Sequence, residues 1–145
     1  MMDPNLTDIS HVIQLAVAPV FLLTAIATLI NALNTRLGRI VDRRRVVQER
    51  LHTCEPGDAE AATTEIANLH RRTRLIYYAI FCAVLSALLV CMVVAGAFLG
   101  ALLGIDLARS VATVFIGAML AMISGLGLFL REVYLAVRTA AHHRH

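Results

Sequence analysis

The first apolar run of the chain extends from Val12 to Thr35 and contains side chains that form hydrogen bonds. These side chains are Gln14, Thr24, Thr28, Asn31, Asn34 and Thr35. On a helix most of them share one side, while leucine and isoleucine residues occupy the rest, so the sequence predicts a polar seam along a membrane-spanning helix. Hydroxyl and amide groups need partners inside hydrocarbon, and this seam is therefore expected to face other helices or water.

The polar seam has two interpretations. In the first, it forms hydrogen bonds between packed helices, and Thr24 and Thr28 also bond to carbonyl groups of their own helix. In the second, several copies of the helix surround an axis and line a narrow polar pathway, because three helices are too few to enclose one alone. Asn31 and Asn34 would then form rings of amide groups at the mouth of that pathway.

Arginine dominates the segment that follows the polar seam. All thirteen basic residues of the chain are arginine, and nine of them lie between residues 36 and 74. The first of these are Arg36, Arg39, Arg43, Arg44 and Arg45. Most are expected to determine topology and to anchor helices at the membrane surface. Those nearest the membrane are also suited to bind anionic lipid headgroups.

Two residues of this cluster differ from the rest. Asp42 lies three residues from Arg39 and from Arg45, which predicts an ion-pair network on the helix or across to a neighbouring subunit. Arg44 stands where the helical pattern calls for an apolar residue. A charge at such a position typically sets the register of packing or the choice of partner.

No motif of the sequence indicates catalysis. A Gly-rich phosphate loop, a nucleophile elbow and a metalloprotease helix motif are all missing, and the three apolar runs hold no Asp or Glu, which argues against a proton-coupled carrier. His52 and His70 have no carboxylate or cysteine beside them at a ligand spacing, so we expect neither a metal site nor a cofactor. Nucleic-acid binding is not expected either, because the arginine-rich segment contains six acidic residues and no aromatic ones.

Composition and length define the elements that position these residues. Of 145 residues, 59% are hydrophobic and 16% are charged, which is too apolar for a soluble domain of this size and predicts a single membrane domain. A spanning helix needs about 20 apolar residues. Three runs meet this need, and we predict spans at about residues 12–34, 76–102 and 108–130, followed by a tail at 131–145.

The segment between the first two spans, residues 35–74, shows helical periodicity. Apolar positions recur at alternating steps of four and three. The outgoing positions are Leu33, Leu37, Ile40, Arg44, Val47 and Leu51, and the returning positions are Ile66, Leu69, Thr73, Ile76 and Ile80. Glu55 to Asp58 supply a turn, with Asp58 expected to cap the returning helix. The predicted fold is an all-α membrane protein with three transmembrane helices, the first two extended into a cytoplasmic antiparallel helical hairpin.

Topology follows from the distribution of arginine, because short loops rich in Arg and Lys stay on the cytoplasmic side. Nine arginines lie between the first and second spans, and Arg131, Arg138 and Arg144 follow the third. Arg109 is the only one in the other connection. We therefore expect the N-terminus outside, and the hairpin and the C-terminus in the cytoplasm.

Two rows of small residues mark the second and third spans. Gly96, Gly100 and Gly104 form one row, and Gly117, Ala121 and Gly125 form the other. Small residues let helix backbones approach closely in lipid, so these rows are expected to pack the two spans together or to form contacts between subunits. A turn at residues 105–107 would place Gly96 near the level of Gly117.

A family resemblance rests on residues Asn34 to Arg43, with the sequence N-T-R-L-G-R-I-V-D-R, directly after the first span. This block, followed by two further spans, resembles an uncharacterised bacterial membrane family catalogued as domain of unknown function 2721. The resemblance implies a small inner-membrane protein in which Arg36, Arg39, Asp42 and Arg43 match signature positions. It implies no particular substrate, cofactor or partner. Because the signature lies where the first helix leaves the membrane, the resemblance suggests that functional residues are concentrated there.

The expected function is that of a channel or pore-like protein of the inner membrane, not an enzyme. It would assemble from four or more copies of the chain, with the first span lining the axis and the arginine-rich hairpin forming a cytoplasmic collar. The alternative is a non-conducting scaffold or regulatory subunit that docks a partner or anionic lipid through the hairpin. The expected partners are thus further copies of the chain and membrane lipids.

Overall fold

The computed structural model describes residues 4–142, which form three long helices. Helix α1 spans Pro4–Thr53, α2 spans Pro56–Leu103 and α3 spans Ala108–His142. Each is long and apolar enough to cross a membrane, which confirms the prediction of an all-helical chain with three helices of spanning length. At a rise of 1.5 Å per residue, the 50 residues of α1 extend over about 75 Å, more than twice the thickness of a hydrocarbon core.

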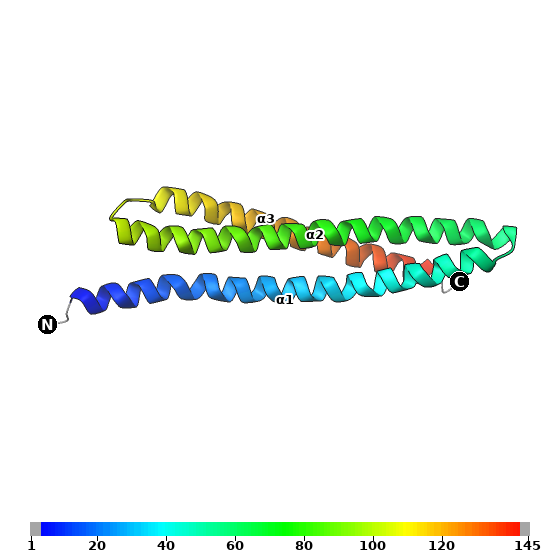
Figure 1. The fold of residues 1–145 in the computed structure, drawn as a ribbon, viewed down its shortest axis with the longest axis horizontal. Helices are drawn as coiled ribbons and strands as arrows, with labels where there is room; N and C mark the ends of the chain where they lie inside the picture. Colours follow the sequence, from blue (N-terminus) through cyan, green and yellow to red (C-terminus); the bar gives the residue numbers. More distant parts are fainter. Residues whose placement is uncertain (1–3, 143–145) are drawn as a thin grey trace.

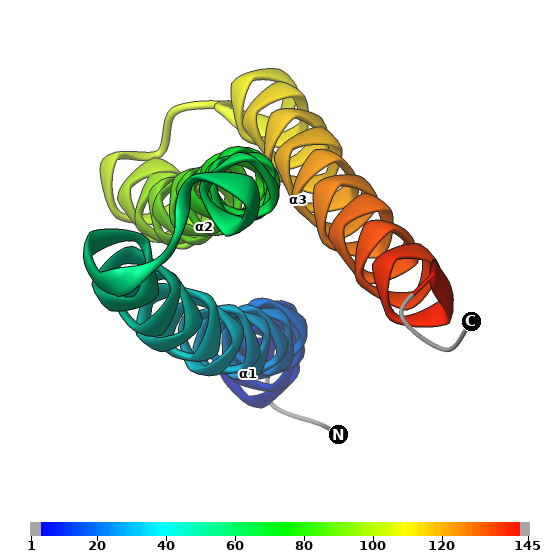
Figure 2. The same cartoon turned by 90° about the vertical axis from the view of Figure 1, so that its right-hand side faces the viewer.

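Helix α2 is the central element of the arrangement. It packs against both other helices, whereas α1 and α3 barely touch each other. Helices α1 and α2 lie side by side and run in opposite directions, and α3 crosses obliquely to this pair (Figures 1 and 2). The oblique crossing brings late turns of α3 to the level where α1 and α2 become rich in arginine.

The core lies along the contact between α1 and α2 and continues onto α3. Every position of the predicted periodic pattern, from Leu33 to Leu51 and from Ile66 to Ile80, is buried or half-buried. Ile26, Leu33, Ile76, Val90 and Ala118 are almost fully enclosed. Apolar residues at steps of three and four thus bury one stripe of each helix, as ridges packing into grooves require.

Short links join the helices. Helix α2 begins at Pro56 and not at Asp58, because the fixed φ of proline suits the first helical position. Asp58 therefore lies in the first turn of α2, and its N–H donates to the Glu55 carbonyl at 3.1 Å. At the other end of α2, Gly104 adopts φ 64° and closes the helix in the left-handed conformation that glycine favours.

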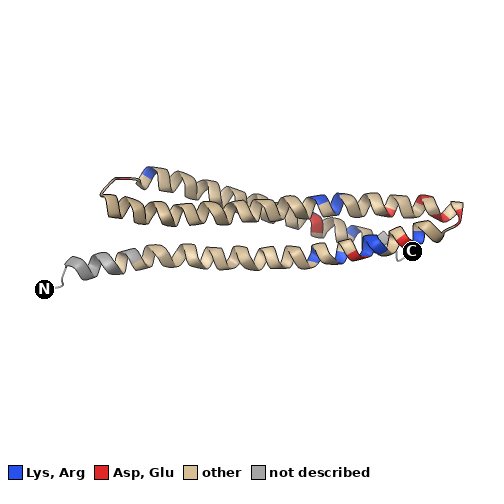
Figure 3. Ribbon diagram, viewed as in Figure 1, with Lys and Arg blue, Asp and Glu red and all other residues tan. Residues whose placement is uncertain are grey.

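Charge is concentrated at one end of the molecule. Among the residues coloured in Figure 3, arginine and the acidic residues gather over the half that contains the link between α1 and α2, and in the other half they lie at or beside the link between α2 and α3. The segment after Leu130 is helical as far as His142 and not a loose tail. Residues 143–145 of the expected tail lie outside the described residues.

The glycine rows pack in a register different from the predicted one. A Cβ on Gly96 would lie 3.3 Å from Val111, whereas one on Gly117 would meet only Leu89 at 3.9 Å, so Gly96 and Gly117 are not level. The register shifts because the link between α2 and α3 folds back onto the end of α2, where a Cβ on Gly100 would lie 3.2 Å from the Ile105 carbonyl oxygen. At Gly125 of α3 an added Cβ would lie 3.3 Å from the Ala79 carbonyl oxygen of α2, so the two helix backbones approach closely there.

Candidate functional site

A buried carboxylate joins all three helices. Glu132 of α3 is 1% exposed, and its two oxygens accept hydrogen bonds from two different helices. Arg36 of α1 donates from Nη1 to Oε2 at 3.1 Å, and Arg72 of α2 donates from Nη2 to Oε1 at 2.7 Å. We refer to Arg36, Arg72 and Glu132 as the Glu132 cluster. It provides a direct polar link between α1 and α3, which otherwise barely touch.

The electrostatics of the Glu132 cluster follow from burial. An isolated buried carboxylate is strongly disfavoured, and two guanidinium donors offset that penalty. The two arginine side chains differ in exposure, at 40% for Arg36 and 21% for Arg72. Arg36 also lies over the ring of Phe129, with its guanidinium carbon 5.1 Å from the ring centroid, which fixes it from a second side.

A groove opens beside the Glu132 cluster. It has a volume of about 480 Å³ and is lined by Ala32, Thr35, Arg36, Arg39 and Ile40 of α1, Arg72 of α2 and Glu132 of α3. We call it the arginine groove. A larger groove of about 770 Å³ follows the arginine-rich part of the α1–α2 pair, and Arg72 lines both. Arg72, which is paired with Glu132, therefore lies between the two grooves.

The polar seam predicted from the sequence lies on the side of α1 that faces away from α2. Its six residues, Gln14, Thr24, Thr28, Asn31, Asn34 and Thr35, are all exposed in the single chain. The three threonine hydroxyls donate to backbone carbonyls four residues earlier, at 2.9–3.1 Å. The side-chain amides of Gln14, Asn31 and Asn34 have no hydrogen-bond partner among the residues described.

The exposed side of α1 differs from that of the other helices in the size of its side chains. Between Phe21 and Val46, α1 exposes no large hydrophobic residue. Its exposed uncharged residues there are Thr24, Ala25, Ala27, Thr28, Asn31, Ala32, Asn34, Thr35 and Gly38. Helices α2 and α3 instead expose bulky apolar side chains, among them Phe81, Leu88, Phe98, Ile116, Ile123 and Leu130. Bulky apolar side chains suit contact with lipid, and small or polar ones suit contact with another helix.

The structure separates the residues of the arginine signature. Arg36 belongs to the Glu132 cluster, and Arg43 pairs with Glu65 of α2 at 3.0 Å on the surface. Arg39 and Asp42 are exposed, and neither forms an ion pair within the described part of the chain, so the predicted network around Asp42 is not found there.

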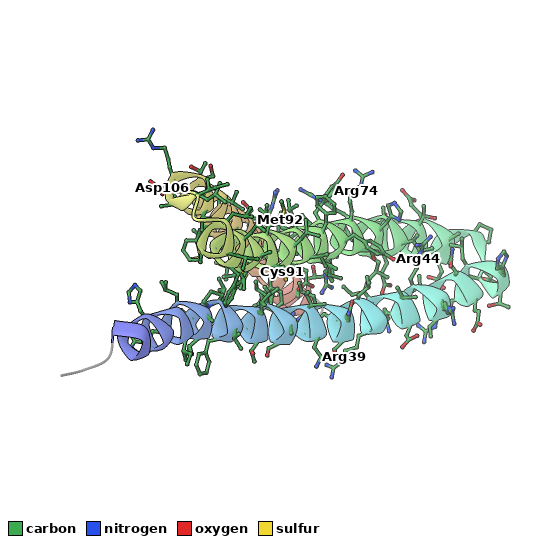
Figure 4. The ribbon with its side chains drawn as sticks, turned by 60° about the vertical axis from the view of Figure 1, so that its left-hand side comes forward. Arg39, Arg44, Arg74, Cys91, Met92 and Asp106 are labelled. Carbon is green, nitrogen blue, oxygen red and sulfur yellow. The ribbon has the colours of Figure 1, made fainter. Side chains whose placement is uncertain are left out.

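Arg44 is half-buried, at the position of the periodic pattern where the sequence calls for an apolar residue. It lies between α1 and α2 (Figure 4), and its Nε is buried without an acceptor among the described residues. The Nε of Arg72 is in the same situation. A buried donor without an acceptor lowers the stability of the fold, so each of these two arginines has an energetic cost at its position.

Glu132 is the residue that sequence reasoning missed. It follows the third apolar run by two positions and was assigned with Arg131 to a tail. A signal was present, because Glu132 is the only acidic residue after Asp106 and stands opposite a segment with nine arginines. A lone acid at the end of a membrane helix needs a basic partner, and that requirement points to the arginines of the other two helices.

Fold and site together define a three-helix membrane protein whose helices are tied by an ion-pair cluster at one end of their apolar part. The chain belongs to the family described as Protein of unknown function (DUF2721), whose model matches residues 16–142. This finding confirms the resemblance seen in the sequence. No curated protein and no solved structure matches the chain.

Proposed function

We propose that this protein is a homo-oligomeric pore of the bacterial inner membrane, with the polar seam of α1 facing a common axis. The observation that carries the proposal is the exposed side of α1 between Phe21 and Val46, which offers small, polar or charged side chains where α2 and α3 offer bulky apolar ones. Amide groups such as those of Asn31 and Asn34 are strongly disfavoured against lipid tails. Copies of α1 around an axis give these amides either one another or water as partners.

Charge and length support the same assembly. Helices α1 and α2 are much longer than the hydrocarbon core, so the arginine-rich half of the α1–α2 pair extends into water as a helical hairpin. The enrichment in arginine supports a cytoplasmic position for this hairpin and the end of α3, with the start of α1 outside. Asp42, which has no ion pair within the described part of the chain, then has an arginine of a neighbouring copy as its partner.

The first experiment determines the oligomeric state of the full chain in detergent by native mass spectrometry. A single closed state of four or more subunits is expected. A monomer or a dimer cannot surround an axis, and either result would exclude the pore.

The second experiment measures ion flux through the purified oligomer in liposomes. Thr28→Leu and Asn31→Leu should change the flux of potassium or chloride while the oligomer stays intact. Thr113→Leu is the matched control, because Thr113 is an exposed threonine of α3 whose hydroxyl also bonds to its own helix, at 2.8 Å. If wild-type oligomers pass no ion tested, the pore is ruled out even if the chain forms a closed oligomer of four or more subunits.

One observation favours a second function, that of a non-conducting scaffold. The larger groove along the arginine-rich half of the α1–α2 pair has room for a segment of another protein, and Arg50 and Asp58 line it. On this proposal Asp42→Ala or Arg44→Leu, each next in sequence to the groove residue Arg43, abolishes capture of a specific partner, and no ion flux is measured. A scaffold is excluded if neither substitution changes the set of proteins cross-linked to the chain in its own membrane.

A further inference from the structure

The arginine groove lies where the apolar runs of all three helices end. Arg36 directly follows the first uncharged run, Arg72 lies just before the second, and Glu132 lies just after the third. Their contacts bring these three ends to one level. Tyr77, Tyr78 and Tyr134 are all exposed near the same helix ends, and tyrosine is enriched where headgroups meet hydrocarbon. The groove is therefore at the depth of lipid headgroups.

The charge of the groove is positive. Three arginines and one carboxylate line it, which gives a formal charge of 3 − 1 = +2. Both carboxylate oxygens already accept from Arg36 and Arg72, and Glu132 is enclosed, so the face open to a ligand presents guanidinium groups. Arg39 is exposed on this face and forms no ion pair within the described residues.

We propose that the arginine groove binds the phosphate group of an anionic phospholipid. Guanidinium groups match phosphate in charge and in geometry, and a volume of about 480 Å³ lies within the range of about 300–1,000 Å³ usual for small-ligand sites. Arg39 and the exposed part of Arg36 contact the phosphate, and the acyl chains follow the apolar surface of the helices toward the membrane centre. Basic pockets between membrane helices bind anionic headgroups in this way. The site does not depend on the proposed pore.

Arg39 is the residue that tests the site, because its replacement leaves the Glu132 cluster intact. Arg74 is the matched control. It is exposed at the same end of the second apolar run but lines neither groove, and Arg39 and Arg74 point away from the α1–α2 pair in opposite directions (Figure 4). Arg39→Gln and Arg74→Gln remove the same charge near the same end of the apolar runs, from opposite sides of the α1–α2 pair.

The experiment titrates the full chain in detergent with dioleoyl phosphatidylglycerol and follows the first bound lipid by native mass spectrometry. Arg39→Gln should weaken this binding about fivefold, the effect of one arginine at a membrane surface. Arg74→Gln should leave it unchanged, and Arg39→Lys should restore most of it. Dioleoyl phosphatidylcholine, which has no net charge, should bind less tightly than phosphatidylglycerol.

Three results would overturn the proposal. Equal weakening by Arg39→Gln and Arg74→Gln would indicate general attraction to the basic end of the molecule and not a site. Unchanged binding in Arg39→Gln, with its helix content intact by circular dichroism, would show that the groove does not hold the lipid. Complete displacement of the lipid by an excess of inorganic phosphate would assign the groove to a free anion, whereas a lipid site keeps its lipid through the acyl chains.

Discussion

Glu132 of α3 and Arg72 of α2 lie 60 residues apart in sequence, and their side chains meet at 2.7 Å. The same carboxylate holds Arg36 of α1 at 3.1 Å. One acidic side chain thus links three helices, of which only two pairs pack extensively against each other. The angle between α3 and the α1–α2 pair is therefore expected to depend on this contact.

Glu132→Gln should lower the free energy of unfolding by about 3 kcal/mol, because it leaves two guanidinium groups without their anion in a partly buried place. The measurement is a denaturant titration of the protein in mild detergent, followed by circular dichroism. Glu60→Gln, an exposed acid in the first turns of α2, is the control and should have little effect. Equal stability of the two variants would contradict a structural role for the cluster.

Arg72→Gln should be more destabilising than Arg36→Gln, by about 2 against about 1 kcal/mol. The reason is that Arg72 is the less exposed of the two, at 21% against 40%, and makes the shorter contact. A double-mutant cycle of each arginine with Glu132→Gln gives the two coupling energies. The reverse order would mean that Arg36, with its contact to Phe129, is the main partner of the carboxylate.

Gly125→Ala should destabilise the contact between α2 and α3 by about 1 kcal/mol. An added Cβ there meets the Ala79 carbonyl oxygen at 3.3 Å, and backbone atoms cannot move aside as a flexible side chain does. Gly127→Ala is the control, because a Cβ at Gly127 meets nothing within 4 Å and alanine is the better helix former. The same unfolding titration should therefore show Gly127→Ala to be neutral or slightly stabilising.

Ser86→Ala should cost about 0.6 kcal/mol, the usual value of a hydrogen bond between membrane helices. The Ser86 hydroxyl is buried and donates to the Ala118 carbonyl of α3 at 2.8 Å. Ser124→Ala is its counterpart, since the Ser124 hydroxyl donates at 2.8 Å to Leu120 of its own helix and joins nothing across the interface. A loss of equal size in Ser124→Ala would show that the measured effect is not interhelical.

The three helices were predictable because their signal is local. In a chain of this composition, uncharged runs of more than 20 residues are best explained as membrane-spanning helices. The periodic positions between Leu33 and Ile80 predicted which side of α1 faces α2. That the polar seam lies on the opposite side of α1 follows from the same periodicity. Assembly, orientation in the membrane and the extension of the hairpin into the cytoplasm stay predictions.

The Glu132 cluster was not predictable from any single helix. Its existence depends on the oblique path of α3, which packs against α2 and barely touches α1. The register of the glycine rows was predicted wrongly for a related reason. The turn lies at the predicted residues, but the link folds back onto Gly100 of α2, and a shift of a few residues at a turn moves every contact of the following helix.

The long separation in sequence of the cluster residues has a consequence for biosynthesis. Arg36 and Arg72 precede Glu132 by 96 and 60 residues. A chain made from its N-terminus therefore presents both arginines to the membrane surface before Glu132 has been synthesised. Until the last helix is inserted, Glu132 cannot serve as their counter-ion, and lipid phosphates are anions of suitable charge at that surface. A nascent chain that stops after two helices thus lacks the carboxylate that links α1, α2 and α3 in the finished protein.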